Sequence, residues 1–298
     1  MKVDFHMHSQ YSNDGELSVQ QIIEKIKEKD IKMFAITDHN NIDAQKEAIQ
    51  LAKENNITYI PGIELCAQVD GNYTHILGLN IDPNTSIFDH QVQRLKEALE
   101  NAVKKQIILC KKELGATYDI DQQVIKCLAH PTNAYMPLYD ELLYNPDNAH
   151  IKILDPYRPN GNRSDLPTVN LYWDLFTKGN PLYVPIEYPD YRDIISIIHE
   201  QNGIAIIAHP FTVYYQKEDL LEKMIEAGID GIECYSNYHN EEQNEYYYDY
   251  ATKHNLLVSV GSDFHGKFKP HIELGEYGLK NQEPSDITEK LIQRLITK

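Results

Sequence analysis

Two short segments near opposite ends of the sequence place metal-binding side chains at alternate positions. The first contains His6 and His8, and the second contains Asp263 and His265. In an extended strand, residues i and i+2 point to the same face, so each pair presents its two side chains together. The two segments can therefore converge as strand ends on a single centre, which requires a fold that brings them side by side.

Further candidate ligands lie between these segments, in the turn after the first predicted strand and at the ends of later ones. A single histidine or aspartate in such a place is more often a helix cap, a turn former or a satisfied polar group. Burying many such groups without a partner is unfavourable, and divalent cations are their usual partner. The sequence therefore predicts a centre with several metal ions. The nine candidate ligands are His6, His8, Asp14, His39, Glu64, His75, His209, Asp263 and His265.

The predicted elements alternate between strand and helix in two stretches, residues 1–88 and 185–298. Seven predicted strands carry ligands or polar tips at their C-terminal ends, where barrel enzymes build their sites. An Asp70-Gly71 hairpin turn is predicted within the first stretch. We therefore expect an α/β fold with a closed, mostly parallel barrel that is interrupted once.

The interruption covers residues 89–184. A long amphipathic helix is predicted from residue 88 to Gly115, because apolar residues recur there at spacings of three and four. Residues 130–167 are rich in Pro, Asn, Tyr and Asp and show little periodicity. Irregular stretches of this length usually belong to a lid or a binding element. We expect residues 89–184 to form a mostly helical insertion that sets substrate specificity.

Charge and cysteine content limit the classes of partner. The formal net charge of −17 argues against binding to long nucleic acids. It does not exclude an anionic substrate, because bound ions dominate the local field of a metal site. No apolar run reaches the roughly 18 residues of a membrane span, and no export signal is seen. The four cysteines lack C-x-x-C spacing, which favours reduced thiols and a cytoplasmic location.

The ordered motifs resemble those of the polymerase and histidinol phosphatase (PHP) superfamily. They are His-x-His, Ser-x-Asp-Gly, Thr-Asp-His, Gly-x-Glu, a following His, Ala-His-Pro and Gly-Ser-Asp-x-His. The resemblance covers residues 1–88 and about 185–275, and it is nearest to stand-alone members that dephosphorylate nucleotides. It implies a distorted seven-stranded (β/α)7 TIM-like barrel with a mostly helical insertion.

The same resemblance implies three metal sites. The first would be held by His6, His8, Glu64 and Asp263; the second by Glu64, His75 and His209; and the third by Asp14, His39 and His265. Every ligand position is filled, which favours an active hydrolase. Mixed imidazole and carboxylate ligands accept Mn, Fe or Zn, so we expect two or three divalent ions.

Such a centre would hydrolyse phosphomonoesters by attack of a metal-bound hydroxide on phosphorus. His209 or His265, where not committed to a metal, could protonate the leaving oxygen. Asp38 stands beside His39 and could fix the tautomer of an imidazole, although a turn or cap role is the alternative. We therefore take Asp38, His209 and His265 as the candidate catalytic residues.

Candidate substrate-binding residues lie outside the ligand set. Arg158 and Arg163 are in the irregular stretch, and a guanidinium matches the geometry of a phosphate. Lys267 and Lys269 follow His265 closely, and Tyr235 ends a strand that often lines the site in the family. For each of them an ordinary surface or packing role is the alternative. The Arg-Pro-His signature of many nucleotide-acting relatives is missing near Arg163, which weakens the inference about substrate.

The sequence thus predicts a metal-dependent phosphoesterase for small phosphorylated metabolites, with nucleotides or nucleoside bisphosphates as the first class. A histidinol-phosphate phosphatase and an exonuclease on short oligonucleotides are alternatives. An amidohydrolase is less favoured, because that class usually bridges its metals with a carboxylated lysine, whereas Glu64 stands at the mid-barrel position here. A non-catalytic metal-binding scaffold would usually have lost ligands.

Overall fold

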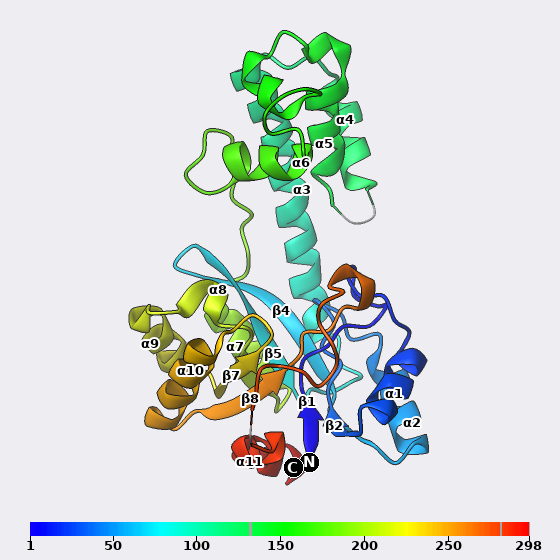
Figure 1. Cartoon of the computed structure of the whole chain (residues 1–298), viewed down its shortest axis with the longest axis vertical. Helices are drawn as coiled ribbons and strands as arrows, with labels where there is room; N and C mark the ends of the chain where they lie inside the picture. The colour runs from blue at the N-terminus through cyan, green and yellow to red at the C-terminus, as the bar shows by residue number, and fades with distance from the viewer. Residues whose placement is uncertain (131–132, 281, 298) are drawn as a thin grey trace. The chain divides into compact units, whose positions relative to one another are not determined.

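The computed structural model describes residues 1–130, 133–280 and 282–297 (Figure 1). The chain divides into two compact units. Unit 1 comprises Met1–Val92 and Tyr188–Lys298 and contains every strand that the structure describes, whereas unit 2 comprises Gln93–Glu187 and is helical. None of the described helices is both long enough and apolar enough to cross a membrane.

Unit 1 is a mixed α/β unit with two β-sheets. The parallel three-stranded sheet has the order β1 (Lys2–Asp4), β2 (Ile31–Phe34) and β3 (Thr58–Tyr59). The five-stranded sheet has the order β4 (Gly62–Val69), β5 (Asn72–Leu79), β6 (Ile204–Ile207), β7 (Gly231–Ser236) and β8 (Leu257–Gly261). β5 is antiparallel to both β4 and β6, and β6, β7 and β8 are parallel.

The predicted hairpin is observed between β4 and β5, where Asp70 and Gly71 have φ angles of 48° and 69°. Positive φ at both central residues is what a two-residue hairpin turn requires, and Asp-Gly tolerates it well. The hairpin reverses the chain, so β5 runs against its neighbours. The sheet is therefore less parallel than the alternation of strands and helices predicted.

Isolated bridges connect the two sheets at two places. Met7 pairs with Phe264 beyond β1 and β8, and His39 pairs with Glu64 beyond β2. Only Ile60 and Pro61 separate β3 from β4, and Pro61 has no N–H to donate to a ladder. In place of one continuous closed ladder, the described part of the chain thus shows two sheets joined by isolated bridges.

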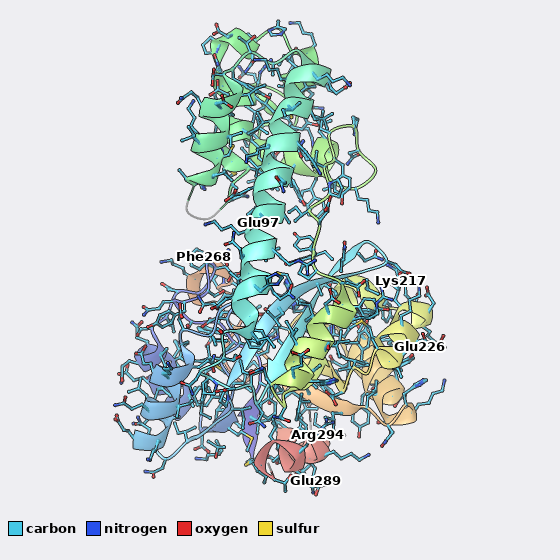
Figure 2. All side chains as sticks on the ribbon, turned by 180° about the vertical axis from the view of Figure 1, so that it is seen from behind. Glu97, Lys217, Glu226, Phe268, Glu289 and Arg294 are labelled. Atoms are coloured by element: carbon cyan, nitrogen blue, oxygen red, sulfur yellow. The ribbon has the colours of Figure 1, made fainter. Side chains whose placement is uncertain are left out.

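Helices cover the sheets of unit 1. They are α1 (Val19–Glu28), α2 (Gln45–Glu54), α7 (Tyr191–Glu200), α8 (Phe211–Tyr214), α9 (Glu218–Glu226), α10 (Glu241–Lys253), α11 (Pro284–Ile287) and α12 (Glu289–Ile296). Figure 2 marks α9 by Lys217 and Glu226, and α12 by Glu289 and Arg294. α1 begins with a capping box between Ser18 and Gln21, and its residues at spacings of three and four are buried.

Unit 2 has its own hydrophobic core, which includes Ile107, Cys110, Leu142 and Leu171. Its elements are α3 (Ile87–Leu114, which begins in unit 1), α4 (Ile120–Leu128), α5 (Met136–Tyr144), the 3-10 helices η1 (Pro146–Asn148) and η2 (Lys152–Tyr157), α6 (Pro167–Leu171) and the π-helix η3 (Tyr172–Phe176). The predicted long helix is observed. It ends at Leu114, just before Gly115, where φ is +68°.

The stretch 130–167, predicted to be irregular, is more ordered than expected. It contains α5, η1 and η2, apart from residues 131 and 132, which lie outside the described residues. Pro137 concealed α5 from the sequence pattern, but proline is tolerated in the first turn of a helix. The buried side chains of Leu138, Leu142 and Leu143 then fix α5 in the core of unit 2.

Candidate metal centre

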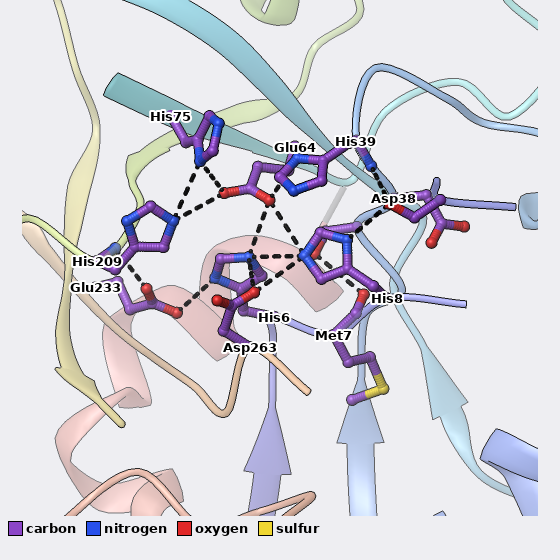
Figure 3. Close-up of polar contacts among 12 residues, drawn as sticks. His6, Met7, His8, Asp38, His39, Glu64, His75, His209, Glu233 and Asp263 are labelled. Atoms are coloured by element: carbon purple, nitrogen blue, oxygen red, sulfur yellow. Dashed lines mark hydrogen bonds and ion pairs between the residues drawn. The ribbon is translucent and has the colours of Figure 1, made fainter. Parts of the chain in front are cut away.

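The nine predicted ligands lie together within unit 1, and Figure 3 shows most of them in close-up. His6 and His8 follow β1, and Asp14 lies in the turn before α1. His39 follows β2, His209 follows β6, and the Asp263 and His265 pair follows β8. Glu64 and His75 lie inside the paired strands β4 and β5. Strand ends from both sheets thus supply one site.

Three overlapping groups within the centre have the geometry of metal sites. Each group offers ligand atoms that lie within 4.8 Å of one another. The groups are His6, His8, Glu64 and Asp263; His39, Glu64 and His75; and His8, Asp14, His39 and His265. The first group matches the predicted set. In the second group His39 takes the place of the predicted His209, and in the third group His8 is added.

The first group is fully buried. Nε2 of His6 and Nε2 of His8 lie 3.1 and 3.0 Å from Oδ1 of Asp263, and 3.3 and 3.2 Å from Oε2 of Glu64. Oδ1 of Asp263 and Oε2 of Glu64 nevertheless have no hydrogen-bond partner among the described residues. Buried oxygens that face nitrogens without bonding them fit a cation between them, because an unpaired buried acceptor is unfavourable.

Glu64 turns its two oxygens toward different neighbours. Oε1 lies 3.0 Å from Nδ1 of His75 and 3.1 Å from Nε2 of His209, whereas Oε2 lies 3.0 Å from Nδ1 of His39. His75 and His209 are themselves 3.2 Å apart through these ring nitrogens. A carboxylate in this arrangement can serve two ions at once, so the donor set fits a shared ligand at Glu64.

Asp14 and His265 complete the third group. Oδ2 of Asp14 lies 3.2 Å from Nε2 of His265 and 3.3 Å from Nε2 of His39. Ions such as Zn²⁺ bind nitrogen and oxygen at about 2.0–2.2 Å, so ligand atoms around one ion lie about 3 Å apart. The separations in all three groups agree with this spacing.

Hydrogen bonds outside the groups orient the rings. Nδ1 of His6 donates to Oε1 of Glu233 at 3.0 Å, and Nδ1 of His265 donates to the carbonyl of Asp263 at 2.7 Å. Nδ1 of His8 lies 3.3 Å from the hydroxyl of Ser12. In each of these three rings Nε2 faces the centre. Hydrogen-bond partners of metal-binding histidines usually orient the ring in this way.

Glu233 has a second contact in the centre. Its Oε2 accepts the backbone N–H of His209 at 2.6 Å, and His209 has a positive φ of 25°. A non-glycine residue with positive φ needs support from its surroundings. The buried Glu233 carboxylate gives this support, so it positions both His6 and His209.

Charges within the centre shift the ionisation of its members. Burial disfavours the charged form of His8, but Asp263 and Glu64 raise its pKa to about 9. Burial also lowers the pKa of His75, to about 4, although Glu64 opposes this. The pKa of Glu64 would be raised by burial, but the surrounding histidines hold it well below its usual range. The carboxylates are therefore ionised near neutral pH, as cation binding requires.

Asp38 has a different contact from the expected one. Both of its oxygens accept hydrogen bonds from Ser9, from the backbone N–H at 2.6 Å and from the hydroxyl at 2.7 Å. The expected bond to an imidazole is thus replaced by an anchor on the segment that carries His8. Ser9 offers two donors next to the Asp38 carboxylate, and the carboxylate accepts both of them instead of bonding an imidazole.

Tyr235 turns away from the site. A β-bulge between Glu233 and Tyr235 places two residues of β7 opposite one residue of β8, which breaks the alternation of faces. Glu233 therefore points into the centre, whereas the ring of Tyr235 lies against Tyr248 at 6.2 Å. This bulge disfavours the substrate contact of Tyr235, which stays a prediction.

The two candidate lysines have different surroundings. Lys267 is exposed and lies 3.5 Å from Glu16, so its contact with substrate remains a prediction. Nζ of Lys269 lies 2.8 Å from Oδ2 of Asp263 and also donates to the hydroxyl of Tyr238. Lys269 therefore lies at the edge of the centre.

The two candidate arginines belong to unit 2. Arg163 pairs with both oxygens of Asp174 at 3.0 and 3.1 Å, and its contact with substrate stays a prediction. The guanidinium of Arg158 donates inside unit 2, to Asp155 and to the carbonyls of Leu142, Leu143, Asn148, Ala149 and Ile151. Arg158 thus binds its own loop, which disfavours a role in phosphate binding; that role stays a prediction.

Sequence reasoning missed Tyr73 and Tyr238. The hydroxyl of Tyr73 contacts Nε2 of His75, and the hydroxyl of Tyr238 donates to Oδ2 of Asp263 at 2.6 Å. Tyr73 could have been found, because it shares a strand face with His75 two residues later. Tyr238 lies in the turn after β7, where no periodicity signals its direction.

Comparisons with known proteins agree with this geometry. A family model described as the PHP domain matches residues 4–295. A phosphoribosyl 1,2-cyclic phosphate 1,2-diphosphodiesterase of Eggerthella lenta is 26% identical over 90% of this chain and 97% of its own length. A 3′,5′-nucleoside bisphosphate phosphatase of Chromobacterium violaceum is 27% identical over 88% and 87%. A 5′-3′ exoribonuclease of Haemophilus influenzae is 30% identical over 89% and 90%.

The fold also matches a solved structure from Chromobacterium violaceum, described as an amidohydrolase with bound sulfate and no metal. The TM-score is 0.67 at 23% identity, and the match covers 99% of this chain and 97% of the other. At this identity the likeness concerns the fold alone. It supports the mixed α/β architecture around the centre.

Proposed function

Because this chain belongs to the PHP domain family, we propose that it is a metal-dependent phosphoesterase that hydrolyses phosphomonoesters of small metabolites. Nucleotides and nucleoside bisphosphates are the substrate class that we place first. The observation that carries this proposal is the convergence of eight ligand side chains in three overlapping groups with unpaired buried oxygens, with His209 beside Glu64 as the ninth. The named relatives are phosphatases, phosphodiesterases and nucleases, which all break phosphate ester bonds.

The centre fits two or three divalent ions of Mn, Fe or Zn. Glu64 would be shared between the group of His6 and the group of His75, and Asp14 would belong to a further group. When bound, such ions make water a usable nucleophile near neutral pH and neutralise charge on the phosphoryl oxygens. The three groups are adjacent, which supports a trinuclear centre.

His209 is the better candidate for protonating the leaving oxygen. Its side chain is 13% exposed, whereas that of His265 is fully buried and uses Nδ1 on a backbone carbonyl. A proton donor must reach the departing group and afterwards regain a proton from solvent. We therefore assign His265 to metal binding and His209 to the face where substrate arrives.

A second candidate activity is exonucleolytic trimming of short oligonucleotides. The Haemophilus influenzae relative, which is 30% identical, is named as a 5′-3′ exoribonuclease. Cleavage of a phosphodiester needs the same ions, so the metal centre does not separate the two activities. The net charge of −17 disfavours extended contacts along a long strand.

Three broader predictions remain proposals. The two sheets, with β3 and β4 counted as one interrupted strand, would form the seven-stranded barrel, and the bridges at Met7 and His39 support this count. Residues 89–184 would set substrate specificity as an insertion. The four cysteines are free and buried, in keeping with a proposed cytoplasmic location.

The test measures hydrolysis of phosphate esters by the purified protein with added Mn²⁺ and, in parallel, with EDTA. Free phosphate is measured for nucleoside monophosphates, nucleoside bisphosphates and histidinol phosphate. Chromatography of the products is used for cyclic phosphodiesters and short RNA, because cleavage of a diester yields a monoester and no free phosphate. We expect metal-dependent release from the nucleotide class, loss of activity in Glu64→Gln, and normal activity in Glu226→Gln, whose carboxylate is exposed on α9. Absence of release from every ester by protein shown to contain its metals would refute the proposal.

A further inference from the structure

Asp263 uses its two carboxylate oxygens for different tasks. Oδ1 faces His6 and His8 and has no hydrogen-bond partner among the described residues. Oδ2 instead accepts the hydroxyl of Tyr238 at 2.6 Å and the ammonium of Lys269 at 2.8 Å. Two donors on one oxygen prevent the carboxylate from rotating, so Oδ1 alone is directed at the ions.

Tyr238 and Lys269 also contact each other. The Lys269 ammonium donates to the Tyr238 hydroxyl oxygen, and its Nζ lies 5.2 Å from the centroid of the phenol ring. The same ring meets His209 edge-on, with 5.4 Å between centroids. Tyr238 therefore lies between Asp263 and His209 on one side of the centre.

The donors of Lys269 are only partly used. An ammonium has three N–H groups, and here one is directed to Asp263 and one to Tyr238. The third has no acceptor in the described ranges, and the side chain is 32% exposed. A cation held at the rim by two partners can give its remaining hydrogen bond to an incoming anion with little further ordering.

We propose that Tyr238 and Lys269 form the phosphate-binding edge of the metal centre. Tyr238 is a positioning residue that fixes Asp263 so that Oδ1 faces the ions. Lys269 is fixed by the same contacts and donates its third hydrogen bond to a phosphoryl oxygen of the substrate. The choice of phosphate as the ligand rests on the proposed function, whereas the role of Tyr238 toward the metals does not.

The first test measures metal binding without turnover. Tyr238→Phe removes one of the two donors to Oδ2, so we expect its metal affinity to fall by about 10-fold or more, as for other partners of metal ligands. Tyr235→Phe is the matched control, because that ring packs away from the centre. Metal content by plasma mass spectrometry over a series of free Mn²⁺ concentrations gives the affinity. Equal affinity in Tyr238→Phe and wild type would overturn the positioning role.

The second test measures binding of inorganic phosphate by calorimetry, at Mn²⁺ concentrations that saturate each variant. We expect Lys269→Met to bind phosphate about 10-fold more weakly or worse, Lys269→Arg to recover part of the affinity, and Lys290→Met on α12 to match wild type. Unchanged phosphate affinity in Lys269→Met would overturn the phosphate contact. Normal phosphate binding by wild type without hydrolysis of any ester would refute the proposed function and leave this inference standing.

Discussion

Glu233 accepts a hydrogen bond from Nδ1 of His6 at 3.0 Å, and neither side chain is exposed. The carboxylate is not itself a member of any of the three ligand groups among the described residues. It nevertheless fixes which ring nitrogen of His6 faces Glu64 and Asp263. The geometry of the centre therefore depends on a residue outside the nine predicted ligands.

Glu233→Gln should weaken metal binding and fold stability together. The two donors face different oxygens of Glu233, and an amide has an NH₂ group in one of these two positions, so either the His6 ring N–H or the His209 backbone N–H would face a donor. One buried donor is left unsatisfied, which costs about 1–3 kcal/mol of unfolding free energy, and metal affinity should fall about 10- to 100-fold. Thermal unfolding and metal titration measure the two effects. Glu226→Gln on α9 is the surface control, and equal behaviour of the two variants would contradict this role.

Substitution of Glu64 should release more metal ions than substitution of Asp14. Glu64 belongs to two ligand groups, and Asp14 belongs to one. We expect Glu64→Gln to lose most of the bound metal and Asp14→Asn to lose only the ion of its own group, because metal affinity follows the ligand set. Metal content per chain after dialysis against metal-free buffer separates the two outcomes. Equal losses in both variants would argue against separate groups.

Gly261→Ala should disturb the centre through a steric clash. A Cβ at this position would lie 2.2 Å from Oε1 of Glu233 and 2.3 Å from Cβ of His6. Both neighbours are buried, so relief requires a shift of the ligand or of its partner. We expect a loss of about 1–3 kcal/mol in unfolding free energy, together with reduced metal content.

The matched control for this substitution is Gly78→Ala in β5. Its Cβ would meet isoleucine side-chain carbons at 3.1 Å, away from the ligands. Gly78→Ala should therefore change stability but leave metal content unaltered. If Gly261→Ala also keeps a full complement of metal, the packing of Gly261 against the centre is not essential.

Buried tyrosines should make the protein sensitive to alkali. Tyr214, Tyr247 and Tyr277 are at most 3% exposed, and burial raises the pKa of each above the usual value of 10.0. Burial also raises the pKa of Tyr135 to about 12. The unfolded chain therefore loses these protons first, so the free energy of unfolding is unaffected below about pH 10 and falls as the pH rises above it.

Two measurements check this alkaline effect. An ultraviolet titration of tyrosinate should show fewer than the 21 tyrosines of the chain ionising near pH 10 in the native state, and all of them in guanidinium. Urea unfolding between about pH 8 and pH 11 should show a midpoint that decreases at the alkaline end. Superimposable native and denatured titration curves would contradict the prediction.

Local patterns in the sequence were sufficient to indicate residues that lie together in the candidate site and many of the elements. The strand period places His6 with His8, and the helix period identifies the buried face of α1. The Asp70-Gly71 hairpin is likewise specified by its own two residues. Each of these features depends on neighbours in the chain, which is why sequence alone could indicate it.

The remaining features depend on partners distant in sequence. The bulge that turns Tyr235 away arises from the pairing of β7 with β8, and the carbonyls that occupy Arg158 come from several turns of unit 2. The antiparallel pairing of β5 with β6 joins segments more than 120 residues apart. No periodicity within one segment encodes such contacts, so sequence reasoning could not have predicted them.

The first ligand group joins residues 6 and 8 to residue 263. During synthesis on the ribosome, both histidines emerge long before Asp263 and His265 have been translated. An ion that met the nascent chain early would find an incomplete set of ligands and would be held weakly. Loading of the first group would therefore be a late event, completed only after Asp263 has been translated.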